Sequence, residues 1–152
     1  LMVRRAAAYS LRDCGPEAAV ALPVFIKAAE SESEYSMKAY SMHALSCIGS
    51  KDPKIVELYL KYLKNPELEM LALGHMKFFG ITAVAAAPEI ASYLDNKDAI
   101  KRRYAAECLG YLGNNRDDIL ELLQSASLKD PDPMVRSRAE ASLKKLKDRQ
   151  SL

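Results

Sequence analysis

Residues 3–15 read Val-Arg-Arg-Ala-Ala-Ala-Tyr-Ser-Leu-Arg-Asp-Cys-Gly, and this stretch decides the fold because its pattern recurs. Further copies begin at residues 37, 68, 101 and 135, at offsets of 34, 31, 33 and 34 residues. Internal repeats with this period are typical of solenoids, in which one supersecondary unit is stacked many times. The chain is therefore interpreted first as a repeat protein.

Each copy has the pattern of an amphipathic helix. Its core-type residues occupy the first, fifth, eighth, ninth and twelfth places, a spacing that puts them on one helical face. The ninth place is held by Leu11, Leu45, Met76, Leu109 and Leu143. In the first four copies the thirteenth place is glycine. Glycine ends helices because it adopts the left-handed conformation without steric cost.

A second apolar segment follows each glycine, over residues 17–30, 53–64, 83–94 and 117–127. Each unit is thus predicted to be a helical hairpin. A lone hairpin cannot bury its apolar face, whereas stacked hairpins share one continuous core. We therefore predict an all-α solenoid of about four and a half hairpins, forming a single domain over residues 1–152. The approximate units are 3–31, 37–65, 68–96, 101–129 and a partial one at 135–147.

The motif Val-Arg-x-x-Ala-Ala-x-Ser-Leu of residues 3–11 resembles a HEAT repeat, as do its variants at 101–109 and 135–143. The short bacterial type, called HEAT-like after phycobilisome lyases, is most similar. The resemblance implies a right-handed α-α superhelix whose second helices line the concave face. It also implies a ladder of contacts between repeats through the basic residue at the second place. That residue is Arg4, Lys38, Arg102 or Arg136.

The third copy departs most from this pattern. It carries Glu69 at the basic second place and Gly74-His75 at a place that elsewhere holds small residues. The resemblance therefore implies a weaker ladder, or a change of curvature, near the middle of the chain.

The composition sets limits on the class of protein. The chain has 22 basic and 20 acidic residues, a net charge of +2 that is too balanced to indicate a polyanionic partner. Its three cysteines have no paired close spacing, which argues against a disulfide framework or a zinc site. We therefore expect a reducing, cytoplasmic compartment. No apolar run is expected to approach the roughly 18 residues of a membrane span, so no membrane association is predicted.

Catalytic and metal-binding motifs are absent from the sequence. His43 is expected to face solvent, and His75 occupies a packed place. The HEAT-type deoxyhypusine hydroxylases hold iron with His-Glu pairs, but here His43 precedes Ala44 and His75 precedes Met76. HEAT-like DNA glycosylases use concave aromatic residues including Trp, and this chain has no Trp. We predict no catalytic residue, no cofactor and no metal.

The cysteines are interpreted as structural rather than nucleophilic. The repeat pattern puts Cys14 and Cys108 at core-type places, where cysteine acts as a compact apolar residue. It leaves Cys47 without an assignment.

The second helices offer a candidate partner surface. In residues 53–64 the polar side chains form one narrow stripe with apolar residues on both sides, which is more apolar surface than one core needs. Equivalent places predict an apolar strip of Val24, Leu58, Tyr62, Tyr93 and Leu122. The predicted edges are Lys27, Lys61, Glu89, Ser92 and Ser125. The alternative is that these residues only widen the core between repeats.

Tyr62 and Tyr93 are the predicted anchors of this strip, because an aromatic side chain combines a large contact area with a polar tip. The predicted ligand is a helix or an extended peptide of another protein. The expected function is therefore that of a protein-interaction scaffold or adaptor.

Nucleic-acid binding is the rival function. A basic ridge is formed by Arg4, Arg5, Lys101, Arg102, Arg103, Arg136 and Arg138. Pairing of these residues with Asp98, Asp130 and Asp132 inside the protein explains the ridge more simply. A role as an accessory part of a HEAT-type enzyme such as a lyase ranks last, and the sequence does not indicate an oligomeric state.

Overall fold

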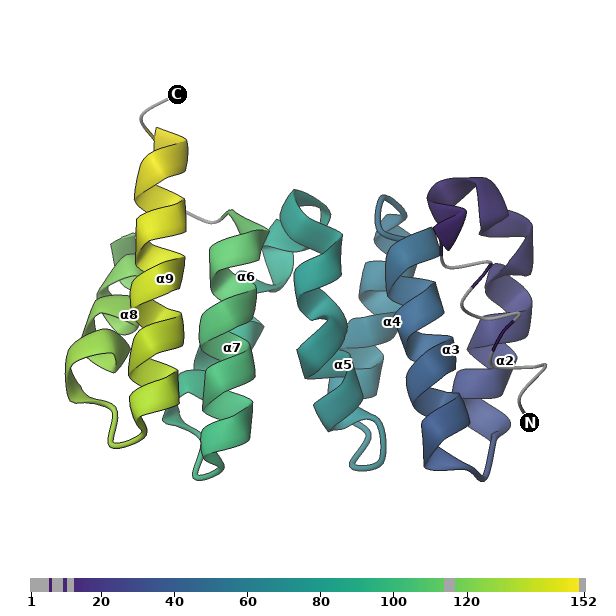
Figure 1. The fold of residues 1–152 in the computed structure, drawn as a ribbon, viewed down its shortest axis with the longest axis horizontal. Helices are drawn as coiled ribbons and strands as arrows, with labels where there is room; N and C mark the ends of the chain where they lie inside the picture. The colour runs from purple at the N-terminus through teal and green to yellow at the C-terminus, as the bar shows by residue number, and fades with distance from the viewer. Residues whose placement is uncertain (1–5, 7–9, 11–12, 114–116, 151–152) are drawn as a thin grey trace. The chain divides into compact units, whose positions relative to one another are not determined.

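The computed structural model describes residues 6, 10, 13–113 and 117–150 (Figure 1). Within these residues every regular element is a helix, which confirms the all-α prediction. The chain divides into two compact units, Leu1–Phe79 and Gly80–Leu152, and the division falls inside the third copy of the repeat. The single domain over residues 1–152 and the right-handed twist stay predictions.

The N-terminal unit contains two α-helices that match the predicted hairpin at residues 37–65. These are α3 (Tyr35–Ile48) and α4 (Pro53–Leu63). Before them, the second segment of the first copy forms the 3₁₀ helix η1 (Gly15–Ala21) and α2 (Leu22–Ser31). Most of the first copy, including Arg4, Arg5 and Leu11, lies outside the described residues.

Local chemistry accounts for where α4 begins. Asp52 Oδ1 accepts a hydrogen bond from the backbone N–H of Lys54 at 2.9 Å, and Pro53 occupies the first turn. An aspartate at this position satisfies an amide that lacks a partner within the helix, and proline is preset for the first turn.

Tyr59 lies at the centre of the core of the N-terminal unit. It is fully buried, its hydroxyl donates to the backbone carbonyl of Met42, and its ring meets Phe79 edge-on at 4.9 Å between centroids. Burial raises the pKa of the Tyr59 hydroxyl. A tyrosine in the core therefore links α4 to α3 by both packing and a hydrogen bond.

The glycines at the thirteenth place end their helices in two different ways. Gly15, Gly80 and Gly113 have positive φ values of 57°, 51° and 70°, and Gly113, with ψ 22°, confirms the left-handed stop. Gly49 has φ −92°, so the same explanation is wrong there. A Cβ on Gly49 would lie 2.7 Å from Cγ1 of Ile55, so this residue is needed for the close approach of α3 and α4.

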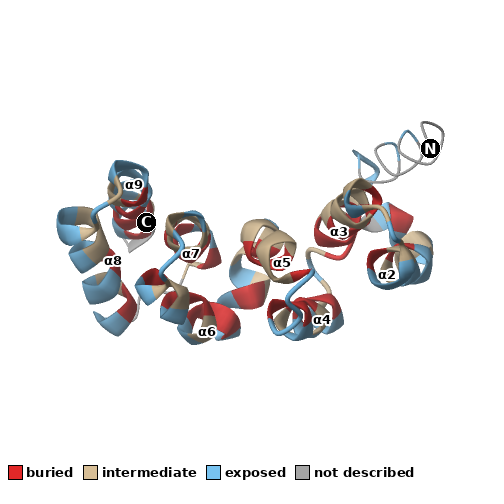
Figure 2. Ribbon diagram, turned by 90° about the horizontal axis from the view of Figure 1, so that it is seen from below, coloured by how far each residue is buried: buried red, intermediate tan, exposed pale blue. Residues whose placement is uncertain are grey.

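The C-terminal unit is built around three long helices, α7 (Ala99–Leu112), α8 (Asp117–Lys129) and α9 (Pro133–Gln150). α9 packs against both α7 and α8. Figure 2 shows buried residues along the inner faces of these helices. On α7 they include Ala105, Leu109 and Leu112, as the repeat pattern predicts. The predicted helices at 101–113, 117–127 and 135–147 are confirmed, with α9 longer at both ends.

The third copy does not form the two regular helices expected at 68–80 and 83–94. It contains α5 (Glu69–His75), the 3₁₀ helix η2 (Met76–Ala86), α6 (Ala87–Ala91) and the 3₁₀ helix η3 (Ser92–Asp95). Gly80 interrupts η2 with φ 51° and ψ −134°, a backbone conformation that is essentially restricted to glycine. Pro88 then lies in the first turn of α6, where a proline is tolerated.

One segment of the chain is long and apolar enough to be a candidate membrane span, contrary to the expectation from the sequence. Residues Glu69–Asp95 include an 18-residue window with a mean hydropathy of 1.4, of which 39% is buried. Length and composition make this segment a candidate span, but core helices of soluble proteins pass the same test. The break at Gly80 shows that the segment is not one continuous α-helix.

Gly110 allows α7 and α9 to approach closely. A Cβ at this position would lie 2.5 Å from Oγ, 2.7 Å from Cβ and 2.8 Å from Cα of Ser142. We predict that Gly110→Ala lowers the free energy of unfolding by about 2 kcal/mol, because the backbone of α9 must move. Urea unfolding measures this change. Ala141→Ser, at an exposed position of α9, is the control and is expected to stay within about 0.5 kcal/mol of the unmodified protein.

Candidate partner-binding groove

The N-terminal unit contains a groove between α2 and α4 with a volume of about 520 Å³. The residues that line it are Leu22, Pro23, Ile26, Asp52, Lys54, Ile55, Glu57, Leu58 and Lys61. The groove therefore combines an apolar floor with charged side chains. Its volume lies within the roughly 300–1,000 Å³ that is typical of ligand pockets.

The sequence of α4 explains this arrangement. Its five buried residues face the core, and they are Ile55, Val56, Tyr59, Tyr62 and Leu63. Lys54, Glu57 and Lys61 are exposed, and their spacing of three and four residues puts them along one side of the helix. Leu58 is half-buried between these two faces and forms part of the groove.

The structure brings only part of the predicted strip to this groove. Leu58 and Lys61 line it, whereas Val24, at 68% exposure, and Lys27 are exposed outside its lining.

The prediction that Tyr62 is a surface anchor is wrong, because its side chain is only 4% exposed. Its hydroxyl donates to Oε1 of Glu30 at 3.3 Å. Burial, with the neighbouring negative charge of Glu30, raises the pKa of Tyr62. Here the alternative interpretation holds, since Tyr62 widens the core.

The C-terminal unit has a smaller groove of about 190 Å³ between η3 and α8. It is lined by Leu94, Asp95, Leu122, Ser125, Ala126, Lys129 and Asp130. Leu122 and Ser125 of the predicted strip are among these residues. Glu89, Ser92 and Tyr93 are not, and Ser92 Oγ instead donates to the backbone carbonyl of Glu89 at 2.7 Å. The strip as one binding surface stays a prediction.

Sequence reasoning missed a third groove, of about 490 Å³, between α8 and α9. Its lining is Gln124, Ser127, Leu128, Glu140, Leu143, Lys144, Lys147 and Asp148. The sequence signal for this groove is Leu128, an apolar residue just before the turn at Asp130. In the structure, Leu128 is 68% exposed.

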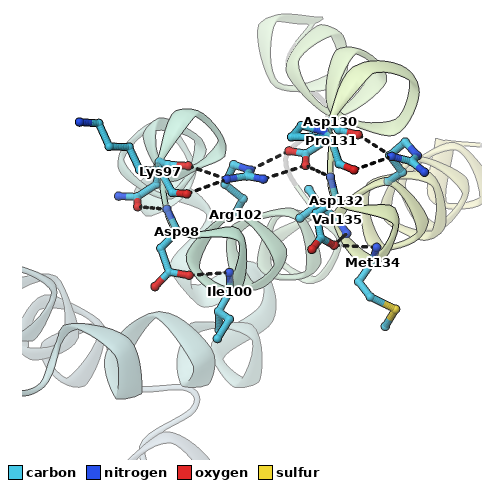
Figure 3. A network of polar contacts seen from close by, with 11 residues as sticks. Lys97, Asp98, Ile100, Arg102, Asp130, Pro131, Asp132, Met134 and Val135 are labelled. Carbon is cyan, nitrogen blue, oxygen red and sulfur yellow. Dashed lines mark hydrogen bonds and ion pairs between the residues drawn. The ribbon is translucent and has the colours of Figure 1, made fainter.

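The basic residue at the second place of the repeat does form contacts between repeats (Figure 3). Arg102 binds Asp130 through two parallel hydrogen bonds, Nε to Oδ2 at 2.8 Å and Nη2 to Oδ1 at 2.9 Å. Its Nη1 also donates to the backbone carbonyls of Asn96 and Lys97, at 2.9 and 3.1 Å. The hydrogen bonds from Arg102 lower the pKa of Asp130.

Arg136 repeats the second half of this arrangement one copy further along. Its Nη1 donates to the backbone carbonyls of Asp130 and Pro131, at 2.7 and 3.1 Å. In the N-terminal unit, Lys38 Nζ pairs with Glu67 Oε2 at 2.6 Å. The predicted contact between repeats is therefore present at Arg102 and at Lys38, whereas Arg136 binds only the turn that precedes its own helix.

Asp98 and Asp132 act as helix caps rather than as the expected ion-pair partners. Asp98 Oδ1 accepts from the N–H of Ile100, and Asp132 Oδ1 accepts from the N–H of Met134, both at 2.8 Å. Each cap supports the turn whose backbone carbonyls bind the arginine.

A family model described as HEAT repeats matches residues 87–152. This match confirms the resemblance to HEAT repeats over residues 87–152. A search of curated proteins finds no match to the chain. HEAT repeats commonly serve as protein-interaction scaffolds.

The HEAT-repeat ladder yields a test of its own. Arg102 and Asp130 have side-chain exposures of only 11% and 6%, so loss of one partner leaves the other unpaired. We predict that Asp130→Asn lowers the free energy of unfolding by about 2 kcal/mol at neutral pH. Since the folded pKa of Asp130 is below its usual value, this stabilisation is present above the usual pKa and is lost as pH falls through the folded value.

Urea unfolding at pH 7 and at about pH 3 measures both parts of this prediction. Asp148→Asn, at an exposed position of α9, is the control. An Asp130→Asn variant that differs from the unmodified protein equally at both pH values would contradict the role of the charge.

The two histidines lie together in the N-terminal unit, His43 on α3 and His75 at the end of α5. The rings of His43 and His75 are stacked, with 5.2 Å between their centroids and an interplanar angle of 11°. The ring centroid of Phe78 lies 5.1 Å from that of His43. His43 is half-buried, so the expectation that it faces solvent is wrong. Within the described residues, no group of three His, Cys, Asp or Glu side chains could hold a metal ion.

The environment of the His75 ring disfavours its protonated form. Its Nδ1 is buried and has no hydrogen-bond partner among the described residues. Burial, with the positive charges of His43 and Lys77, lowers the pKa of His75 to about 4. His75 as a residue is half-buried like His43, so the packed position predicted for it is confirmed only in part.

The burial of the three cysteines agrees with the prediction at Cys108 but not at Cys14. Cys108 is 1% exposed, as expected. Cys14 is exposed and its Sγ donates to the backbone carbonyl of Ser10 at 3.3 Å, so its predicted core position is wrong. Cys47 is half-buried.

The low pKa of His75 makes stability depend on pH. Above pH 6.5 His75 is neutral in both states, but between pH 6.5 and about 4 only the unfolded chain takes up the proton. We predict that the free energy of unfolding falls over this range, by up to about 1.4 kcal/mol per pH unit. Urea unfolding at several pH values measures the slope, and His75→Gln should remove most of it. An unchanged slope in His75→Gln would contradict the assignment.

Proposed function

We propose that this protein is an interaction module that binds a peptide or helix of a partner protein through the groove between α2 and α4. The observation that carries the proposal is the apolar floor of the groove, formed by Leu22, Ile26, Ile55 and Leu58 beside exposed charged residues. Amphipathic helices bind grooves of this kind through their apolar faces.

The family supports an interaction role, since HEAT repeats commonly serve as protein-interaction scaffolds. The basic ridge lends less support to a nucleic-acid partner. Arg102 and Arg136 donate to groups within the protein, and Arg138 lies 3.8 Å from Glu107. The three cysteines are free thiols, which suits a reducing, cytoplasmic compartment.

Selection from a displayed peptide library tests the proposal and does not require an identified partner. We predict that peptides selected on the unmodified chain bind Leu58→Glu at least about tenfold more weakly, because a carboxylate on the apolar floor must be desolvated. Val24→Glu is the matched control. Val24 is an exposed apolar residue of α2 that does not line the groove, and its replacement should leave binding unchanged.

Circular dichroism and urea unfolding show whether both variants are folded. If folded Leu58→Glu retains the selected peptides, the groove is not their binding site. If both variants lose binding equally, the exposed face of α2 is involved and the assignment to the groove is wrong.

A further inference from the structure

The two sides of the groove between α2 and α4 differ in charge. α2 contributes only apolar lining residues, namely Leu22, Pro23 and Ile26. The charged lining residues belong to α4 and its cap, and those on the exposed side of the helix are Lys54, Glu57 and Lys61. An occupant of the groove therefore meets charge along one edge only, and the three exposed residues of α4 present it in the order positive, negative, positive.

These three charges are open to a partner. Among the described residues, none of the three side chains forms an ion pair or a hydrogen bond. Asp52 differs, because its carboxylate accepts from the backbone N–H of Lys54 and thereby caps α4. Lys54 and Lys61 are seven residues apart, or about 10.5 Å along the helix axis. Another helix lying along α4 would repeat this spacing on its own surface.

We propose that the occupant of the groove is an amphipathic helix that carries an acidic, a basic and an acidic residue along the flank facing α4. Its two acidic residues are seven positions apart and pair with Lys54 and Lys61, and the basic residue between them pairs with Glu57. This inference rests on the proposed function and adds the chemistry of the partner. The order is almost symmetrical, so it fits a helix running in either direction.

The floor and the edge have different roles in this recognition. Burial of the apolar stripe against Leu22, Ile26 and Leu58 supplies most of the affinity. Exposed ion pairs add little each, but a wrong partner that places like charges opposite Lys54 or Lys61 is penalised. The charged edge therefore selects among helices that share the same apolar face.

Two helical probe peptides of about 20 residues test the inference. Both have the same leucine face, composition and net charge. On the flank one carries Glu-Lys-Glu and the other Lys-Glu-Lys, with the remaining charges moved to the opposite face. Fluorescence anisotropy measures the dissociation constant of each peptide. We expect the Glu-Lys-Glu peptide to bind about tenfold more tightly at low salt, or about 1.4 kcal/mol, and the preference to shrink at high salt.

Charge reversal on the protein provides the decisive comparison. The triple variant Lys54→Glu, Glu57→Lys and Lys61→Glu should invert the preference. Lys64→Glu makes the same change in net charge on the exposed residue that follows α4, outside the lining, and it should leave the preference as it is. Circular dichroism confirms that both variants are folded.

The outcomes separate this inference from the proposed function. Equal binding of the two peptides, or a preference that the triple variant does not invert, overturns the order of charges. If that equal binding is lost in Leu58→Glu, the groove still binds peptides. If neither probe binds, the proposal that the occupant is a helix with this charge order is wrong. The library selection is not restricted to such helices, so it still tests whether the groove binds peptides.

Discussion

In the C-terminal unit, the apolar face of a helix is covered by a helix of the neighbouring repeat. The helices α7 and α9 show the consequence, since they occupy equivalent places in successive copies and pack together. Gly110 and Ser142 meet where a Cβ on the glycine would not fit. Burial of apolar surface is not directional, so this close fit decides how α7 and α9 meet.

The turns between repeats need a second kind of interaction, because the ends of helices expose backbone groups that have no partner within the helix. In the C-terminal unit, Arg102 donates to two turn carbonyls and to the carboxylate of Asp130 in the next turn. Asp132 then caps α9 from the same turn. Arg102 thus joins two consecutive turns, and its charge is used inside the protein.

The candidate site follows from how the second helices are covered. α4 buries Tyr59 and Tyr62 against the core, leaves Leu58 half-covered and exposes its charged side. A helix covered on two sides retains only a narrow free surface, so binding there depends on a few residues. Because α2 provides an apolar edge and α4 a charged edge, the groove can distinguish between partner helices that share the same apolar face.

The sequence alone determined the described helices outside the third copy, most of their bounds and the basic residues that bind the turns. Periodic apolar residues, glycine stops and capping aspartates act locally and are visible in the order of residues. Tertiary structure decided which apolar residues remain open. Tyr62 and Val24 carry the same apolar signal in the sequence, but one is buried against Glu30 and the other is exposed. Tertiary packing also decided that His43 stacks on His75 and that Gly80 interrupts the third copy. Exposure and stacking depend on neighbours from distant segments, and helical periodicity within one segment does not record those neighbours.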